Sequence, residues 1–287
     1  MRQLLATALL VALLGACGSE PQQPGTIETT PTPAAGSVDH IRDLAHEGLL
    51  PRDVLVWTPP GYEENPGRHY PVLYMHDAQM LFDATITWNG QEWGVDESIV
   101  RMVEAGEIEP LIVVGLANTG TRTADYSPGP RGEAYMDFLV NSVKPMIDGR
   151  YRTRPGKTTT LVAGSSMGGL ISCMLGWQYP DVFGAALCFS PAFRMEGEPD
   201  WSLFFTASDG GKRDVFFYVD NGGVGLEERL QPGIDYLLGF WQEQGYCEGE
   251  DFVLVVDAEA EHKETAWAER FPAALQLGLA KARENDN

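Results

Sequence analysis

The chain has 287 residues, with 41 acidic and 20 basic side chains, and its formal net charge at pH 7 is −21. The sequence has no basic run that could neutralise phosphate, which argues against nucleic acid as a partner. A solvated acidic surface accounts for the charge. No internal repeat divides the chain, and the length beyond its N-terminal segments suits one α/β domain.

The first 16 residues have the pattern of a secretion signal. One positive charge at Arg2 precedes an apolar run, from Leu4 to Leu14, that is too short to span a bilayer. The run ends in Leu14-Gly15-Ala16-Cys17, which resembles the cleavage box of bacterial lipoproteins. The resemblance implies that residues 1–16 are removed and that Cys17 carries the lipid. The alternative is an ordinary secretory signal with an incidental cysteine.

A proline- and threonine-rich segment follows at residues 17–37. It has almost no apolar content, so we expect an extended tether before a folded domain at residues 38–287. These features predict a protein anchored by lipid to the cell envelope, on the periplasmic or extracellular side. Three other cysteines follow, Cys173, Cys188 and Cys247. Cys173 and Cys188 lie in apolar surroundings that favour buried thiols, and a disulfide is the alternative.

Strand and helix patterns alternate through the domain. The alternation predicts a mainly parallel sheet covered by helices on both faces, with the functional site at the C-terminal ends of the strands. Short apolar runs predict strands at 53–57, 71–75, 111–116, 158–163, 185–189, 215–219 and 252–256. One-sided apolar patterns predict helices at 92–105, 135–147 with a kink at Pro145, 228–244 and 266–282.

The stretch Gly164-Ser165-Ser166-Met167-Gly168 stands between a β-branched run and a helix-compatible run. A Gly-x-Ser-x-Gly pattern at a strand-to-helix turn lifts its central serine clear of the sheet, because only glycines let the strand and helix approach so closely. The helix N-terminus then stabilises negative charge on a reacting carbonyl oxygen. The pattern predicts Ser166 as a nucleophile. Ser165, one position early, should point into the packing of the strand.

A serine hydroxyl needs a base, and among the five histidines only His262 follows the serine, as the order of an α/β-hydrolase requires. It lies in a polar loop between the last strand and the last helix. We assign no base role to His76, which ends a strand. A metal site from His76, Asp77 and His262 lacks any helical ligand spacing, so no metal and no cofactor are expected.

The acid that orients the base should follow the strand at 215–219. Asp220 ends that strand but could instead fix the glycine-rich turn after it. Glu227 and Glu228 lie beyond the turn at a helix start, where they could equally be favoured by the helix dipole. We predict Glu228 as the acid, with Glu227 as the next choice.

Further motifs extend along the domain, with Thr-Pro-Pro-Gly-Tyr ending the first strand and His-Asp-Ala-Gln-Met-Leu-Phe-Asp ending the second. They resemble the esterase-D and enterochelin-esterase branch of the α/β-hydrolases, which also includes feruloyl and acetyl-xylan esterases. The resemblance covers nearly the whole domain. The matching stretches are 56–62, 71–83, 93–97, 122–128, 145–153, 164–169 and 262–270.

The resemblance implies an α/β-hydrolase fold, with Ser166 as nucleophile and His262 as base. It also implies an oxyanion hole formed by the backbone N–H groups of Met167 and Gln79. The chain departs from the family at Ala78, where glycine is usual, and in the region of the acid, whose loop does not have the usual Gly-x-x-Asp form.

Chain order places an aromatic segment and Arg122 near this site. We predict that Arg122 and Trp93 bind substrate, since stacking and charge-assisted hydrogen bonds suit a ring-bearing or acidic ester; the alternative is that the tryptophans fill the core. The predicted function is a serine esterase acting on a small-molecule ester, such as a siderophore or a feruloyl or acetyl carbohydrate. A non-catalytic envelope module and an acyltransferase to a sugar are the alternatives, and the oligomeric state is left open.

Overall fold

The computed structural model describes residues 27–31, 36–207 and 211–284. The predicted signal peptide at residues 1–16 and the predicted lipidation site Cys17 lie outside the described residues. None of the described helices is both long and apolar enough to cross a membrane.

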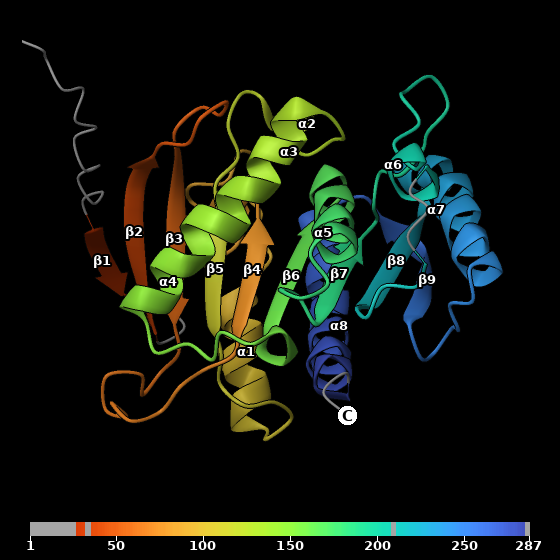
Figure 1. Cartoon of the computed structure of the whole chain (residues 1–287). Helices are drawn as coiled ribbons and strands as arrows, with labels where there is room; N and C mark the ends of the chain where they lie inside the picture. Colours follow the sequence, from red (N-terminus) through yellow and green to blue (C-terminus); the bar gives the residue numbers. More distant parts are fainter. Residues whose placement is uncertain (1–26, 32–35, 208–210, 285–287) are drawn as a thin grey trace, which may run out of the picture.

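The described strands form one twisted sheet in the order β1-β2-β3-β5-β4-β6-β7-β8-β9 (Figure 1). The six neighbouring strands β5, β4, β6, β7, β8 and β9 pair in parallel. At one edge of the sheet β3, β2 and β1 pair antiparallel, each with its neighbour, so the prediction of a mainly parallel sheet is confirmed. The strands are β1 (Ile27–Pro31), β2 (Ser37–Leu44), β3 (Arg52–Thr58), β4 (Val72–His76), β5 (Ile112–Leu116), β6 (Thr160–Ser165), β7 (Ala185–Phe189), β8 (Phe216–Val224) and β9 (Phe252–Glu261).

Helices cover both faces of the sheet. The longer ones are α1 (Val95–Glu104), α3 (Pro130–Asp137), α4 (Lys144–Arg150), α5 (Met167–Gln178), α7 (Leu226–Glu243) and α8 (Glu264–Glu284), and two single turns are α2 (Arg122–Asp125) and α6 (Leu203–Thr206). Helices α1 and α8 bury their apolar faces in one core, and α3, α4, α5 and α7 in another. Figure 1 shows α3 to α5 in front of the sheet and α1 and α8 behind it.

Helix α5 is buried on almost every side, which explains why its sequence is apolar all round. Cys173 on this helix and Cys188 on β7 are buried free thiols, as predicted, and Cys247 is an exposed one. The predicted helix at 135–147 lies within an unbroken helical stretch that runs from α3 through α4. The irregularity in it is a wider, π-helical turn at Phe138–Val143, and Pro145 follows this turn directly.

The N-terminal edge of the sheet also differs from expectation. The sequence predicts a tether at residues 17–37, but Ile27–Pro31 within this segment pairs with β2 as strand β1. The low apolar content of this segment does not prevent pairing, because an edge strand is held by its backbone ladder. Proline is tolerated there, since one side of an edge strand needs no N–H donor. The folded domain thus begins before residue 38.

The topology brings chemically active residues to one end of the sheet. Strand β4 ends at His76, β6 ends immediately before Ser166, and β9 ends immediately before His262. Because these strands all lie in the parallel part of the sheet, their C-terminal ends share one edge.

Candidate active site

Ser166 lies at a sharp turn between β6 and α5, as the Gly-x-Ser-x-Gly pattern predicts. Its backbone has φ 59° and ψ −120°, a conformation that residues with a side chain rarely adopt. The Ser166 N–H donates to the carbonyl of Phe189 at 2.9 Å, and the Ser166 carbonyl accepts from Leu170 at 3.0 Å. A Cβ added to Gly164 would lie 2.7 Å from the backbone oxygen of Gly168. The missing side chain at Gly164 therefore permits the close approach of β6 and α5.

A cavity of about 510 Å³ opens above this turn. Ser166 and His262 both line it, which places the predicted nucleophile and base in one site. Ser165 also borders the cavity, but it is a buried residue of β6, whereas Ser166 is partly exposed.

The carboxylate beside His262 belongs to Glu227. Its Oε2 lies 3.3 Å from Nδ1 of His262, and the Glu227 side chain is fully buried. Neither of these two atoms has another hydrogen-bond partner among the described residues, so the pair is free to tighten. Bonds between catalytic groups are often long in the absence of substrate. The edge of the Trp267 ring packs against the imidazole, with ring centroids 4.8 Å apart.

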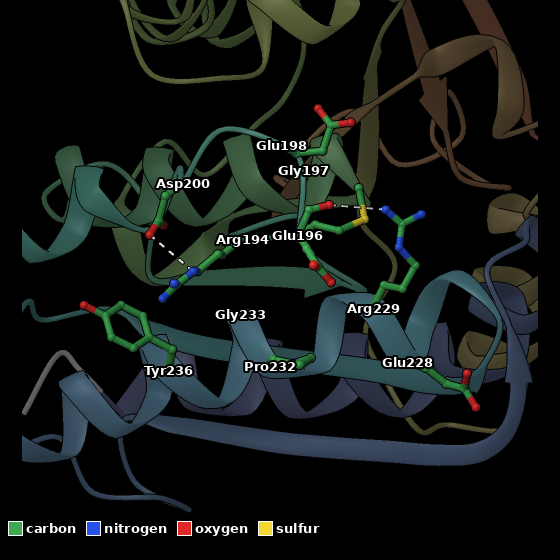
Figure 2. A pocket seen from close by; sticks show the side chains of 11 residues that line it. Arg194, Glu196, Gly197, Glu198, Asp200, Glu228, Arg229, Pro232, Gly233 and Tyr236 are labelled. Atoms are coloured by element: carbon green, nitrogen blue, oxygen red, sulfur yellow. Dashed lines mark hydrogen bonds and ion pairs between the residues drawn. The ribbon is translucent and has the colours of Figure 1, made fainter.

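The prediction of Glu228 as the acid is wrong in position. Neighbouring residues on a helix point about 100° apart, so the turn of α7 that buries Glu227 turns Glu228 outward. Glu228 is exposed and lines a different groove of about 820 Å³, together with Arg194 and Tyr236. Figure 2 shows Glu228 at one end of that groove. The described residues that line the groove include neither the predicted nucleophile nor the predicted base.

Asp220, the third candidate acid, is paired elsewhere. Its buried carboxylate accepts a hydrogen bond from Nε of Arg270 at 2.7 Å and another from the backbone N–H of Ser190 at 2.9 Å. Sequence analysis did not identify Arg270, because its partner lies fifty residues earlier in the chain.

The loop after β4 carries the predicted oxyanion donor Gln79 in a short 3₁₀ turn, Ala78–Met80. Asp77, which precedes the turn, has φ 61°, a left-handed conformation. Nε and Nη2 of Arg122 donate to the two oxygens of Asp77 at 2.8 and 2.7 Å, and Asn118 donates to one of them at 2.7 Å. Burial alone would raise the pKa of Asp77, but the Arg122 charge and these hydrogen bonds hold it below its ordinary value.

Arg122 lines the cavity, and the structure adds a partner that sequence analysis missed. Its guanidinium spans both oxygens of Asp77, and Nη2 also lies 3.4 Å from the carbonyl oxygen of Ser165. This arrangement links the loop after β4 to the end of β6. A role in binding substrate stays a prediction.

His76 forms part of the cavity wall next to Asp77. Its Nδ1 lies 2.7 Å from the hydroxyl of Tyr135. Burial lowers the pKa of His76 to about 3, although the Asp77 charge opposes this shift. His76 is therefore neutral in the folded protein at ordinary pH.

The aromatic residues near the site divide into two groups. Trp93 borders the cavity but is only 4% exposed, and it stacks on Trp267 with ring centroids 5.6 Å apart. Its main contacts are thus with the core. Trp88, at 80% exposed, stands at the rim of the same cavity and is available to a ligand.

Comparison with known proteins bears on what this site does. Residues 50–280 match the family described as "Putative esterase". The chain belongs to this esterase family. It is accordingly a carboxylic ester hydrolase by class, and the predicted resemblance to esterases is confirmed.

Individual relatives of this esterase are distant in sequence. The uncharacterised protein YbbA of Bacillus subtilis is 20% identical over 249 residues, which cover 81% of this chain and 94% of YbbA. A solved ferulic acid esterase superposes with a TM-score of 0.69 at 20% identity, over 86% of this chain and 98% of its own. The enterobactin esterase FES from Shigella flexneri gives a TM-score of 0.64 at 15% identity, over 93% of this chain and 61% of FES. These superpositions confirm the α/β-hydrolase fold.

Proposed function

We propose that the chain is a serine esterase in which Ser166, His262 and Glu227 form a catalytic triad. His262 takes the proton of the Ser166 hydroxyl while the oxygen attacks the ester carbonyl, and Glu227 stabilises the imidazolium that forms. Collapse of the tetrahedral intermediate breaks the ester bond, and His262 gives the proton to the departing alcohol. Water, activated by the same base, then releases the acid and restores Ser166.

One observation carries this proposal. A strained serine at a strand-to-helix turn and a histidine facing a buried carboxylate line the same cavity. Charge on the tetrahedral oxygen would be stabilised by the N–H groups of Met167 and Gln79. Met167 begins α5 and Gln79 lies in the 3₁₀ turn Ala78–Met80. The first N–H groups of such helical turns have no acceptor within the helix.

The substrate we propose is a small-molecule ester with a ring-bearing or polar group. The cavity has the volume of sites that hold molecules of this size. Trp88 offers a stacking surface at the rim. Solved proteins of this fold include a ferulic acid esterase and an enterobactin esterase, which supports esters of feruloylated carbohydrates or of siderophores as the first classes to test.

We also propose that the mature protein is held at the cell envelope by lipid on Cys17. The proposal depends on the Leu-Gly-Ala-Cys sequence that ends the apolar N-terminal run. Expression of the full chain in a bacterial host, followed by membrane fractionation, tests it. The full chain should sediment with membranes and the Cys17→Ala variant should not, and equal distribution of the two would refute the anchor.

The enzymatic proposal is tested by a panel of p-nitrophenyl esters, feruloyl sugars and a ferric siderophore. The full chain should hydrolyse at least one of them, and Ser166→Ala should lose nearly all of that activity. A fluorophosphonate probe should label Ser166 and leave Ser165 unmodified, as read by peptide mass spectrometry. Full hydrolysis by Ser166→Ala would show that the reaction does not depend on this serine.

A further inference from the structure

A buried serine stands directly behind Glu227. Ser190, the residue after β7, is fully buried, and its hydroxyl donates to Oε1 of Glu227 at 2.6 Å. Because Ser190 occupies Oε1, the other carboxylate oxygen is the one left for His262. A short bond to a buried carboxylate is among the stronger hydrogen bonds in proteins.

The same hydroxyl also holds the aromatic side chain that packs on the base. Nε1 of Trp267 donates to Oγ of Ser190 at 2.9 Å, while the Trp267 ring lies edge-on to the His262 imidazole. Through these two hydrogen bonds, Ser190 therefore contacts both Glu227 and Trp267, the side chains that lie against His262. It touches neither the imidazole nor, since it is buried and lies outside the cavity lining, a substrate.

The backbone of Ser190 is fixed in turn by a buried ion pair. Ser190 has φ 42°, in the left-handed region that costs a residue with a side chain about 1 kcal/mol or more. Its N–H donates to Oδ1 of Asp220 at 2.9 Å, and Asp220 is bound by Arg270. Nη2 of Arg270 also lies 3.5 Å from Oγ of Ser190. Such strain persists only where the surroundings determine the conformation.

We infer that Ser190 is a positioning residue of the esterase, which orients the carboxylate of Glu227 toward His262 and is itself set by the Asp220–Arg270 ion pair. The inference rests on the proposed triad. It also gives Asp220 a role, because its carboxylate fixes Ser190, which in turn orients the carboxylate of Glu227.

Two substitutions of Ser190 test the inference, because one variant alone could lose activity through a change in folding. Ser190→Gly suits the positive φ and Ser190→Ala keeps the Cβ, and both remove the hydroxyl. Each should lower kcat about 10- to 100-fold, the range expected for loss of a hydrogen bond to a buried charge, with little change in KM. Ser202→Ala is the matched control, because Ser202 is also buried and donates to a carboxylate, that of Asp200, away from His262. It should match the wild type.

The pH profile separates positioning from a merely structural effect. In both Ser190 variants the acid limb of kcat/KM should move to lower pH, because the Glu227 carboxylate that stabilises the protonated imidazole is no longer held toward it. The other charged groups that line the cavity with His262, namely Asp77, Arg122, Lys263 and Glu264, remain in every variant, as does the buried Asp220–Arg270 ion pair. In a Glu227→Gln background, Ser190→Gly should cause no further loss of kcat, since it acts through that carboxylate.

Three results decide the matter. An unchanged acid limb in both Ser190 variants, or losses of kcat that multiply in the double variant, would overturn the inference while leaving the esterase proposal intact. Absence of any ester hydrolysis and of Ser166 labelling in the wild type would overturn the proposed function, and the inference with it.

Discussion

Replacement of Glu227 by glutamine tests the assignment of the triad acid. The variant keeps the shape of the side chain and the oxygen that accepts from Ser190, but it removes the charge 3.3 Å from His262. At an effective dielectric constant of about 20, two unit charges at that distance attract by about 5 kcal/mol. At about 1.4 kcal/mol for each factor of ten, the loss corresponds to a fall in kcat/KM of roughly 10³- to 10⁴-fold.

The assay is steady-state hydrolysis of the best ester from the panel, with circular dichroism as a check on folding. Glu228→Gln is the matched control, because it removes the same charge one residue along and Glu228 is exposed to solvent. It should stay within about twofold of the wild type, as substitutions on the surface commonly do. If Glu227→Gln is within tenfold of the wild type and Glu228→Gln is nearly inactive, the reasoning from burial and distance is wrong.

Three other predictions concern the framework of the site. Gly164→Ala should destabilise the protein by about 1–3 kcal/mol in urea unfolding, because its Cβ would overlap the backbone of Gly168; an unchanged midpoint would contradict this. Arg122→Ala should lower the free energy of unfolding by about 2 kcal/mol, because it leaves the Asp77 carboxylate with Asn118 but without a cationic partner. The loss is smaller than for a fully buried ion pair because the arginine side chain is 29% exposed, and no loss of stability would refute the pairing. Burial lowers the pKa of His76 to about 3 in the folded protein, from about 6.5 in the unfolded chain. Between these pH values only the unfolded chain binds a proton at this residue, so the folded state loses stability as the pH falls through that window. From pH 7.5 to 5.5, protonation of His76 in the unfolded chain should lower the free energy of unfolding by about 1.4 kcal/mol. The His76→Gln variant should lack this loss, and an equal dependence of stability on pH in the two proteins would exclude a contribution from His76.

Local signals in the sequence predict most of the fold, and they single out two residues that line the candidate site. The strand–turn–helix around Ser166 is encoded in adjacent residues, so the pattern and its chain context identify it together. His262 follows from chain order, because it is the only histidine after the serine. The parallel sheet follows from apolar runs that alternate with helices, whereas the polar strand β1 has no such signal.

The choice of Glu228 follows from a predicted helix start that lies too late in the chain. A helix from residue 228 leaves Glu227 outside it, whereas α7 begins at Leu226 and has both glutamates in its first turn. The sequence does contain the signal that separates them. Glu227 is in phase with apolar residues three or four positions apart along the buried face of α7, and Glu228 is not; these residues are Leu230, Ile234, Leu237 and Trp241.

Ion pairs between distant segments could not be predicted. The Asp77–Arg122 pair joins the loop after β4 to α2, and the Asp220–Arg270 pair joins β8 to α8. Each pair consists of side chains that are far apart in the sequence and that only the fold brings together, so no local sequence pattern predicts it. For this reason the sequence indicates a substrate-binding role for Arg122 without its partner Asp77, and Asp220 as a candidate acid or turn residue without its partner Arg270.

The central claim is that Ser166 forms a covalent acyl intermediate, and rapid acid quench followed by mass spectrometry tests it most directly. During hydrolysis of the best p-nitrophenyl ester, the wild type should show a burst of p-nitrophenol. The peptide that contains Ser166 should show a mass increase equal to that of the bound acyl group. The Ser166→Ala variant should show neither. An acyl group found on another residue, or steady hydrolysis by the Ser166→Ala variant, would contradict the account.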